Sequence, residues 1–151
     1  MTSHLAQLNV GRLLATKGDP RVAAFFGDLD RINAIADASP GFVWRLVDDG
    51  GADATSLRPF GPDVLVNLSV WESLDALREF TFRSPHLEVL RRRREWFEPY
   101  GDVSAVLWWL PAGHIPTPTE AGERLDLLRR NGSTPDAFSF RDPFPAPITA
   151  G

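Results

Sequence analysis

The segment Val64–Trp71, with the sequence VLVNLSVW, places an amide, a hydroxyl and an indole among aliphatic residues. Successive side chains of a strand point to opposite faces, so Asn67, Ser69 and Trp71 would share one face with Leu65. An amide or a hydroxyl needs a hydrogen-bond partner if it is buried. A neighbouring side chain, a water or a pocket ligand would each serve. The pattern therefore suggests a pocket, and it does not by itself name a reaction.

An arginine-rich segment follows, in which the run Arg91–Arg94 sits behind Leu87 and Leu90. At helical spacing Arg91 is four residues from Leu87 and Arg94 is four from Leu90, which puts both next to the apolar stripe. A buried guanidinium needs a planar anionic or carbonyl partner. A structural ion pair, or a side chain that reaches water, is the common alternative.

His86 would lie in the first turn of that helical region, after Pro85. A histidine there can ligate haem iron or transfer a proton, although a helix N-terminus disfavours the charged ring. The alternative is a partly buried histidine that only forms hydrogen bonds. No pair of histidines has the H-x-x-x-H spacing, so we predict no metal site.

The five tryptophans are numerous for this length and are candidates for lining a pocket for a flat ligand, or for core and subunit contacts. Trp108 and Trp109 are adjacent in one expected strand and must point to opposite faces. Beside Asn67, Trp71 and Arg91 as candidate catalytic residues, the candidates for substrate binding are Gln7, Asn9, Ser69, His86 and Trp108.

Composition favours a cytoplasmic globular protein of 151 residues, with 43% hydrophobic and 24% charged residues. A net charge of −4 argues against nucleic acid as a partner, and no apolar run approaches the roughly 20 residues that span a bilayer. The absence of cysteine excludes disulfides and thiolate chemistry.

Local patterns predict strands at residues 4–13, 42–47, 64–71 and 104–110. Helices are expected after Asp19-Pro20, after Ser73, across 87–97, and after Thr119, where capping residues precede apolar spacing. Residues 48–63 have the composition of a loop. This order is β-α-β-β-α-β, the ferredoxin-like α+β pattern with a four-stranded antiparallel sheet.

We assign residues 1–115 to this domain and expect residues 116–151 to form an extra helix and a Phe/Pro-rich tail on the same domain. Helices on one side of the sheet would leave the other face bare. Because that face is also apolar, we expect a second subunit to cover it, forming a homodimer.

The segments HLAQLNVGRL, SPGFVWRL, VNLSVWESLDAL, FRSPHLEVLRRRREWF and LWWLPAGHIPT resemble a bacterial family of unknown function. That family is assigned to the dimeric α/β-barrel superfamily. The resemblance covers nearly the whole chain and implies the ferredoxin-like fold and a dimer. It implies no activity.

A wider resemblance is to the antibiotic-biosynthesis monooxygenases of that superfamily. Their cofactor-free, quinone-forming members carry Asn and Trp at N-x-x-x-W spacing, which Asn67 and Trp71 match, and an arginine on the next helix, best matched by Arg91. The resemblance implies that Asn67 polarises a substrate oxygen, Trp71 packs on the ring and Arg91 stabilises an oxyanion. Tyr100 does not stand where those enzymes place a pocket tyrosine.

Haem-degrading enzymes of the same fold also bear a partial resemblance. Asn9 matches their first-strand asparagine, but Phe80 and Arg91 stand where a Trp and a His would be. A likeness of RSPH to haem-containing carotenoid monooxygenases keeps His86 open as an iron ligand. Three functions therefore stay open: a cofactor-independent oxygenase for a small aromatic or polyketide-like substrate, a non-catalytic binder of a hydrophobic small molecule, and a haem protein.

Overall fold

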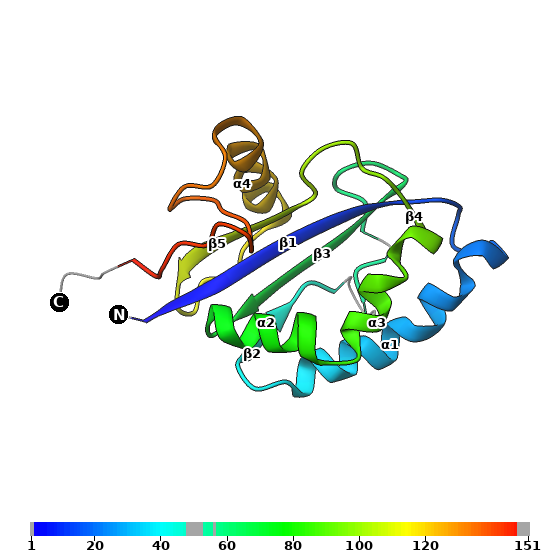
Figure 1. Ribbon diagram of the computed structural model, residues 1–151, viewed down its shortest axis with the longest axis horizontal. Helices are drawn as coiled ribbons and strands as arrows, with labels where there is room; N and C mark the ends of the chain where they lie inside the picture. The colour runs from blue at the N-terminus through cyan, green and yellow to red at the C-terminus, as the bar shows by residue number, and fades with distance from the viewer. Residues whose placement is uncertain (1, 48–52, 56, 148–151) are drawn as a thin grey trace.

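The computed structural model describes residues 2–47, 53–55 and 57–147, so part of the expected loop 48–63 lies outside the described residues. Figure 1 shows a twisted sheet with helices on both sides. The strands are β1 (Ser3–Leu13), β2 (Phe42–Arg45), β3 (Val64–Trp71), β4 (Phe97–Glu98) and β5 (Ala105–Pro111). The helices are α1 (Ala23–Ala38), α2 (Leu74–Arg83), α3 (His86–Arg91) and α4 (Pro118–Asn131), with 3₁₀ turns at Pro20–Val22 and Arg93–Glu95.

The sheet is antiparallel and runs in the order β2-β3-β1, with both β4 and β5 pairing the far side of β1. Strand β1 is therefore central, and β3 and β5 flank it. This is the ferredoxin-like order expected from the β-α-β-β-α-β pattern, which is confirmed. The sheet has five strands rather than four because the two-residue strand β4 also pairs with β1.

Two helical segments begin directly after the capping residues that the sequence predicts. The Asp19 carboxylate accepts a hydrogen bond from the Arg21 amide, and the Ser73 hydroxyl accepts one from the Ala76 amide. Each bond satisfies one of the free amides of a first helical turn. The cap of α4 is Thr117 rather than Thr119, because Pro118 takes the first helical position.

The expected helix over 87–97 is wrong beyond Arg91. Helix α3 ends there, a 3₁₀ turn follows, and Phe97 already belongs to β4. Trp96 is buried between them, and the Arg92 guanidinium lies 4.7 Å from the centre of its ring. Where the helix has ended, Trp96 is buried, and Phe97 pairs with Leu13 and packs its ring against Gly11.

The second face of the sheet is covered within the chain, by α4. Helix α4 lies on the side of the sheet opposite α1, α2 and α3 (Figure 1). Its side chains Ala121, Leu125 and Leu128 form one buried cluster with the even-numbered residues of β1 and β3, among them Leu8 and Leu68. Helix α4 thus covers the sheet face whose exposure led us to expect a second subunit. A homodimer stays a prediction, which sedimentation tests.

The segment after α4 passes around the outer edge of β5. Phe138 exchanges two backbone hydrogen bonds with Leu107, at 2.8 and 2.9 Å, and its fully buried ring packs on the α2 side of the sheet. The Trp109 indole donates to the Phe144 carbonyl at 2.9 Å. The C-terminal segment therefore connects α4, on one side of the sheet, with the apolar cluster on the α2 side. Within the described residues, no helix is long and apolar enough to cross a membrane.

Candidate functional site

Four polar side chains form a band across the sheet on the side that α1, α2 and α3 cover. The cross-strand register pairs Gln7 with Ser69 and Asn9 with Asn67. At one end of this polar band lie Leu5 and Trp71, and at the other lie Leu13 and Leu65, each pair in its own apolar cluster. The band, comprising Gln7, Asn9, Asn67 and Ser69, thus separates two apolar clusters on a single sheet face.

The Gln7 amide connects two other members of the band, Asn67 and Ser69. Its Nε2 donates to Asn67 Oδ1 at 2.6 Å and to Ser69 Oγ at 2.9 Å, which uses both of its hydrogens. Ser69 Oγ also accepts from Trp71 Nε1, at 2.9 Å. The buried polar groups therefore find their partners in neighbouring side chains, one of the alternatives that the sequence leaves open.

The network runs from a buried end to a solvent-facing end. Trp71 is 1% exposed and Ser69 6%, whereas Asn67 and Asn9 are exposed although they lie in the middle of their strands. Exposed amides on an otherwise covered face mean that the helices leave the sheet open at this point. The band is therefore accessible to a ligand at Asn67 and Asn9.

Trp71 is already packed by aromatic side chains. Its ring stacks on Phe80, with centroids 5.1 Å apart, and meets Phe42 edge-on at 5.4 Å. A substrate ring cannot take the Phe80 face of this indole without displacing Phe80. In this arrangement Trp71 contacts the polar band through its hydrogen bond to Ser69. The sequence offered one sign of the stack, since Phe80 is three residues from the buried Leu77 on α2.

His86 extends the aromatic stack. Its ring lies 4.8 Å from Phe80, and its Nδ1 is 3.2 Å from the Thr81 carbonyl oxygen. A carbonyl only accepts, so Nδ1 carries the hydrogen and the neutral ring keeps its lone pair on Nε2. Burial holds the pKa of His86 below its ordinary value of 6.5, and the bond to Thr81 opposes this effect. The histidine is neutral at pH 7.

The low pKa of His86 predicts a loss of stability in mild acid. The unfolded chain takes up the proton near pH 6.5, whereas the folded protein does so only at lower pH. The free energy of unfolding should thus be undiminished above about pH 6.5 and fall as the pH drops below it. Urea midpoints measured across this range should depend less on pH in His86→Asn, whose amide retains a donor for Thr81. His114→Asn, at an exposed histidine, is the control; an unchanged slope in His86→Asn would contradict the assignment.

Arg91 does not join the network. It lies in the last turn of α3 and is exposed, as are its three arginine neighbours in the sequence. Arg92 pairs with Glu95 at 2.9 Å. The expected approach of Arg91 to a buried apolar stripe is wrong because α3 contains no buried residue: Leu87 and Leu90 are only partly buried, so a side chain one turn from Leu87 still reaches solvent. The structure thus brings Asn67 and Trp71 into one network and leaves Arg91 outside it.

Trp108 faces the opposite side of the sheet from Asn67. It pairs with Ala6, is fully buried against α4, and donates from Nε1 to Glu120 at 3.2 Å. Trp109, which shares a face with Gln7, is a tryptophan that was not among the candidates for substrate binding. Alternation separates the two tryptophans, but only the pairing of β5 with β1 shows which of them accompanies Gln7.

A surface pocket of about 530 Å³ lies beside the aromatic stack. Phe80 and Ser84 line it from α2 and the turn that follows, together with the carboxylates of Glu72, Asp75 and Glu79. None of the candidate catalytic residues Asn67, Trp71 and Arg91 is among its lining residues. Among the described residues, no group of three or more His, Asp or Glu side chains is placed to hold a metal ion.

The sheet order and the helices on its two faces define a ferredoxin-like α+β domain with an added C-terminal helix. The expected family is confirmed by a match over residues 4–150: the chain belongs to the family described as "Domain of unknown function (DUF3291)". No curated protein sequence matches the chain significantly.

Several solved structures are similar at low identity. SnoaB, a cofactor-independent oxygenase from Streptomyces nogalater, has a TM-score of 0.48 and 17% identity, over 76% of this chain and 97% of its own. A protein of unknown function from Nitrosomonas europaea has a TM-score of 0.48 and 13% identity, over 77% and 97%. A putative antibiotic biosynthesis monooxygenase from Chloroflexus aurantiacus has 0.46 and 16%, over 75% and 97%.

Proposed function

We propose that the polar band is the floor of a site for a small aromatic or polyketide-like molecule, which is oxidised there without a cofactor. The observation that carries the proposal is the network from buried Trp71 to exposed Asn67. A network fixed at its buried end holds the exposed amide in one orientation. Such preorganised donors stabilise charge on a substrate oxygen more than mobile ones do.

Asn67 is suited to bind an oxygen atom. Its Oδ1 accepts from Gln7, so its amide hydrogens are left to donate away from the network. Asn9 faces it directly across the two strands and offers a second exposed amide. Two neighbouring amides can donate to one carbonyl or phenolate oxygen, or to two oxygens of a polycyclic ligand.

The reaction follows from the resemblance to cofactor-free, quinone-forming monooxygenases. A methylene group between two aryl rings, conjugated with a ring carbonyl, loses a proton to solvent water, and the resulting electron-rich enolate reacts with dioxygen. The overall change is R₂CH₂ + O₂ → R₂C=O + H₂O, in which dioxygen accepts four electrons and supplies one oxygen atom to the product. Asn67 would stabilise the enolate oxygen. We propose separately that Arg91 stabilises the oxyanion, as the resemblance implies. The rate of turnover in Arg91→Ala tests this contribution.

Binding without turnover is the second candidate, and one observation favours it. Gln7, Asn67, Ser69 and Trp71 contain no group that ionises near neutral pH, so the network orients a ligand but transfers no proton. The haem alternative fits the structure poorly. The pocket next to His86 and Phe80 is lined by three carboxylates, which would repel the propionates of a haem.

The proposal is tested with the anthrone dithranol as the probe, in oxygen-saturated buffer with purified protein. Dioxygen uptake and formation of the anthraquinone are expected above the uncatalysed rate, with one oxygen atom from labelled dioxygen in the product. Asn67→Ala should lower this rate by about a hundredfold, as the loss of an oxyanion donor does elsewhere. Asn131→Ala, at an exposed asparagine on α4, is the matched control.

Each outcome decides between the candidates. Saturable binding of dithranol that Asn67→Ala weakens, with no turnover, would favour the binding protein. Turnover unaffected by Asn67→Ala would show that the polar band is not the site. Absence of both binding and turnover would rule out this class of ligand.

A further inference from the structure

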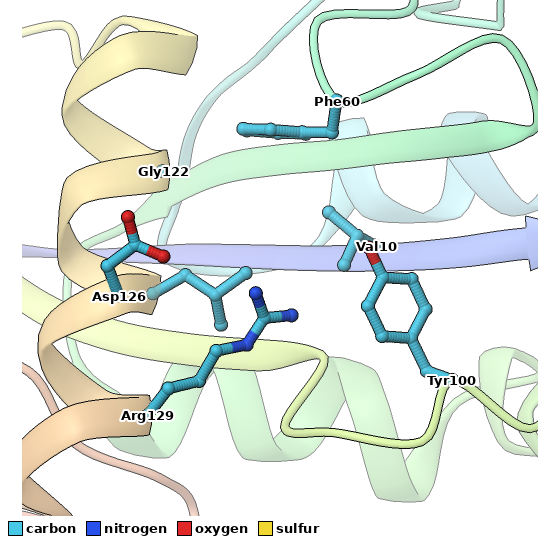
Figure 2. Close-up of a pocket in the computed structure, with 7 residues that line it drawn as sticks. Val10, Phe60, Tyr100, Gly122, Asp126 and Arg129 are labelled. Atoms are coloured by element: carbon cyan, nitrogen blue, oxygen red, sulfur yellow. The ribbon is translucent and has the colours of Figure 1, made fainter.

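A second cavity lies on the α4 side of the sheet, away from the polar band. Its volume is about 240 Å³, and Val10 and Leu125 form its apolar floor. Figure 2 shows the rings of Phe60 and Tyr100 on two sides of it, and the side chains of Asp126 and Arg129 reaching toward it from α4. A cavity with two aromatic walls and an apolar floor suits a small aromatic ring.

The absence of a side chain at Gly122 makes room for the Phe60 ring, one of the two aromatic walls. A Cβ atom at this position would come within 2.9 Å of Phe60 Cε1, closer than carbon atoms approach. Glycine within a helix is unfavourable relative to alanine. Its presence in the middle of α4 lets the Phe60 ring lie against the helix backbone and form the side of the cavity.

Two arginine side chains lie over the ring of Tyr100, the second aromatic wall. The guanidinium of Arg12 lies 4.8 Å from the centre of the Tyr100 ring, and that of Arg129 lies 5.6 Å from it. Arg129 is fixed further by two hydrogen bonds to the Val103 carbonyl, at 2.9 and 2.7 Å, and by Asp102 at 3.6 Å. The positive charge of Arg129 is therefore already matched by protein groups.

Asp126 is the charge in this cavity without a protein counterion. It is exposed at the mouth, and none of the ion pairs within 4.0 Å among the described residues includes it. An exposed carboxylate beside an apolar, aromatic-walled space attracts a ligand with an aromatic body and a cationic end. An anionic ligand would meet this carboxylate and find Arg129 occupied.

We infer that the cavity between α4 and β1 binds a small aromatic amine, with its ring between Phe60 and Tyr100 and its ammonium group at Asp126. The site is independent of the polar band, because it lies on the other face of the sheet. It is built largely by α4, so the added helix provides a binding function as well as covering the sheet.

Calorimetric titration with three indole probes tests the charge preference: tryptamine is cationic, tryptophol neutral and indole-3-acetate anionic. Tryptamine should bind saturably, tryptophol about tenfold more weakly, and indole-3-acetate more weakly still. Asp126→Asn should reduce tryptamine binding to the level of tryptophol. Glu123→Gln removes the same charge from an exposed position of α4 outside the cavity and should leave binding unchanged.

Two further variants locate the ligand. Gly122→Leu should abolish tryptamine binding by filling the cavity, with thermal unfolding as the check that the protein is folded. Asn67→Ala should have no effect, because it changes the other face. No saturable tryptamine binding up to millimolar concentration, equal binding of indole-3-acetate, equal effects of Asp126→Asn and Glu123→Gln, or loss of binding in Asn67→Ala would each overturn the inference.

Discussion

Replacing Trp71 with alanine is expected to lower the free energy of unfolding by about 3–5 kcal/mol. Trp71 is 1% exposed and contacts Phe42 and Phe80, so its removal leaves a cavity that these rings cannot fill without leaving their own positions. It also removes the indole donor to Ser69. Urea unfolding at pH 7.5, above the range in which His86 titrates, measures the effect.

Two other variants separate the causes of that loss. Trp71→Phe keeps a ring in the stack but has no donor for Ser69, and should cost less than the alanine variant. Trp109→Ala removes a half-buried tryptophan from the same sheet face and should also cost less. If Trp71→Ala changed stability by under about 1 kcal/mol, the described packing of Trp71 would be incorrect.

Replacing Phe138 with alanine is expected to destabilise the fold by a similar amount, about 3–5 kcal/mol. The ring is fully buried in the cluster that includes Leu5 and Leu107, although it comes from a segment without regular structure. Loosening this segment would also expose the edge of β5, and free strand edges pair between molecules. We therefore expect unfolding at lower urea concentration together with concentration-dependent association.

Phe82→Ala is the control for this prediction. Phe82 is 42% exposed and touches the same tail through Phe140, with ring centroids 5.5 Å apart. Its replacement should change stability by under about 1 kcal/mol. Equal losses in the two variants would indicate that the tail contributes through general contact rather than through the buried Phe138 ring.

The sequence was most informative where one local signal decides the structure. The alternation in VLVNLSVW predicts strand β3 at its observed bounds, and the capping side chains of Asp19 and Ser73 predict where their helices begin. These features depend on neighbours in the chain, so a single sequence contains them.

The features that could not be predicted depend on contacts between distant residues. The bond from Gln7 to Asn67 requires the register of β1 against β3, which alternation alone leaves open. The exposure of Arg91 depends on how α3 packs against the rest of the fold, where its apolar residues Leu87 and Leu90 are only partly buried. Similarly, an apolar sheet face indicates that a cover is needed, but not whether α4 or a second subunit supplies it.

Covering the sheet with α4 has a consequence for synthesis on the ribosome. The β1 residues Ala6 and Leu8 are made early, whereas their cover, Ala121 and Leu125, is made more than a hundred residues later. Contacts between segments so far apart form slowly because a long loop must close first. Until α4 emerges, the nascent chain carries a complete apolar sheet face with nothing over it. We therefore expect chaperones to bind this nascent chain. Its newly made strands should be most prone to aggregation just before α4 is synthesised.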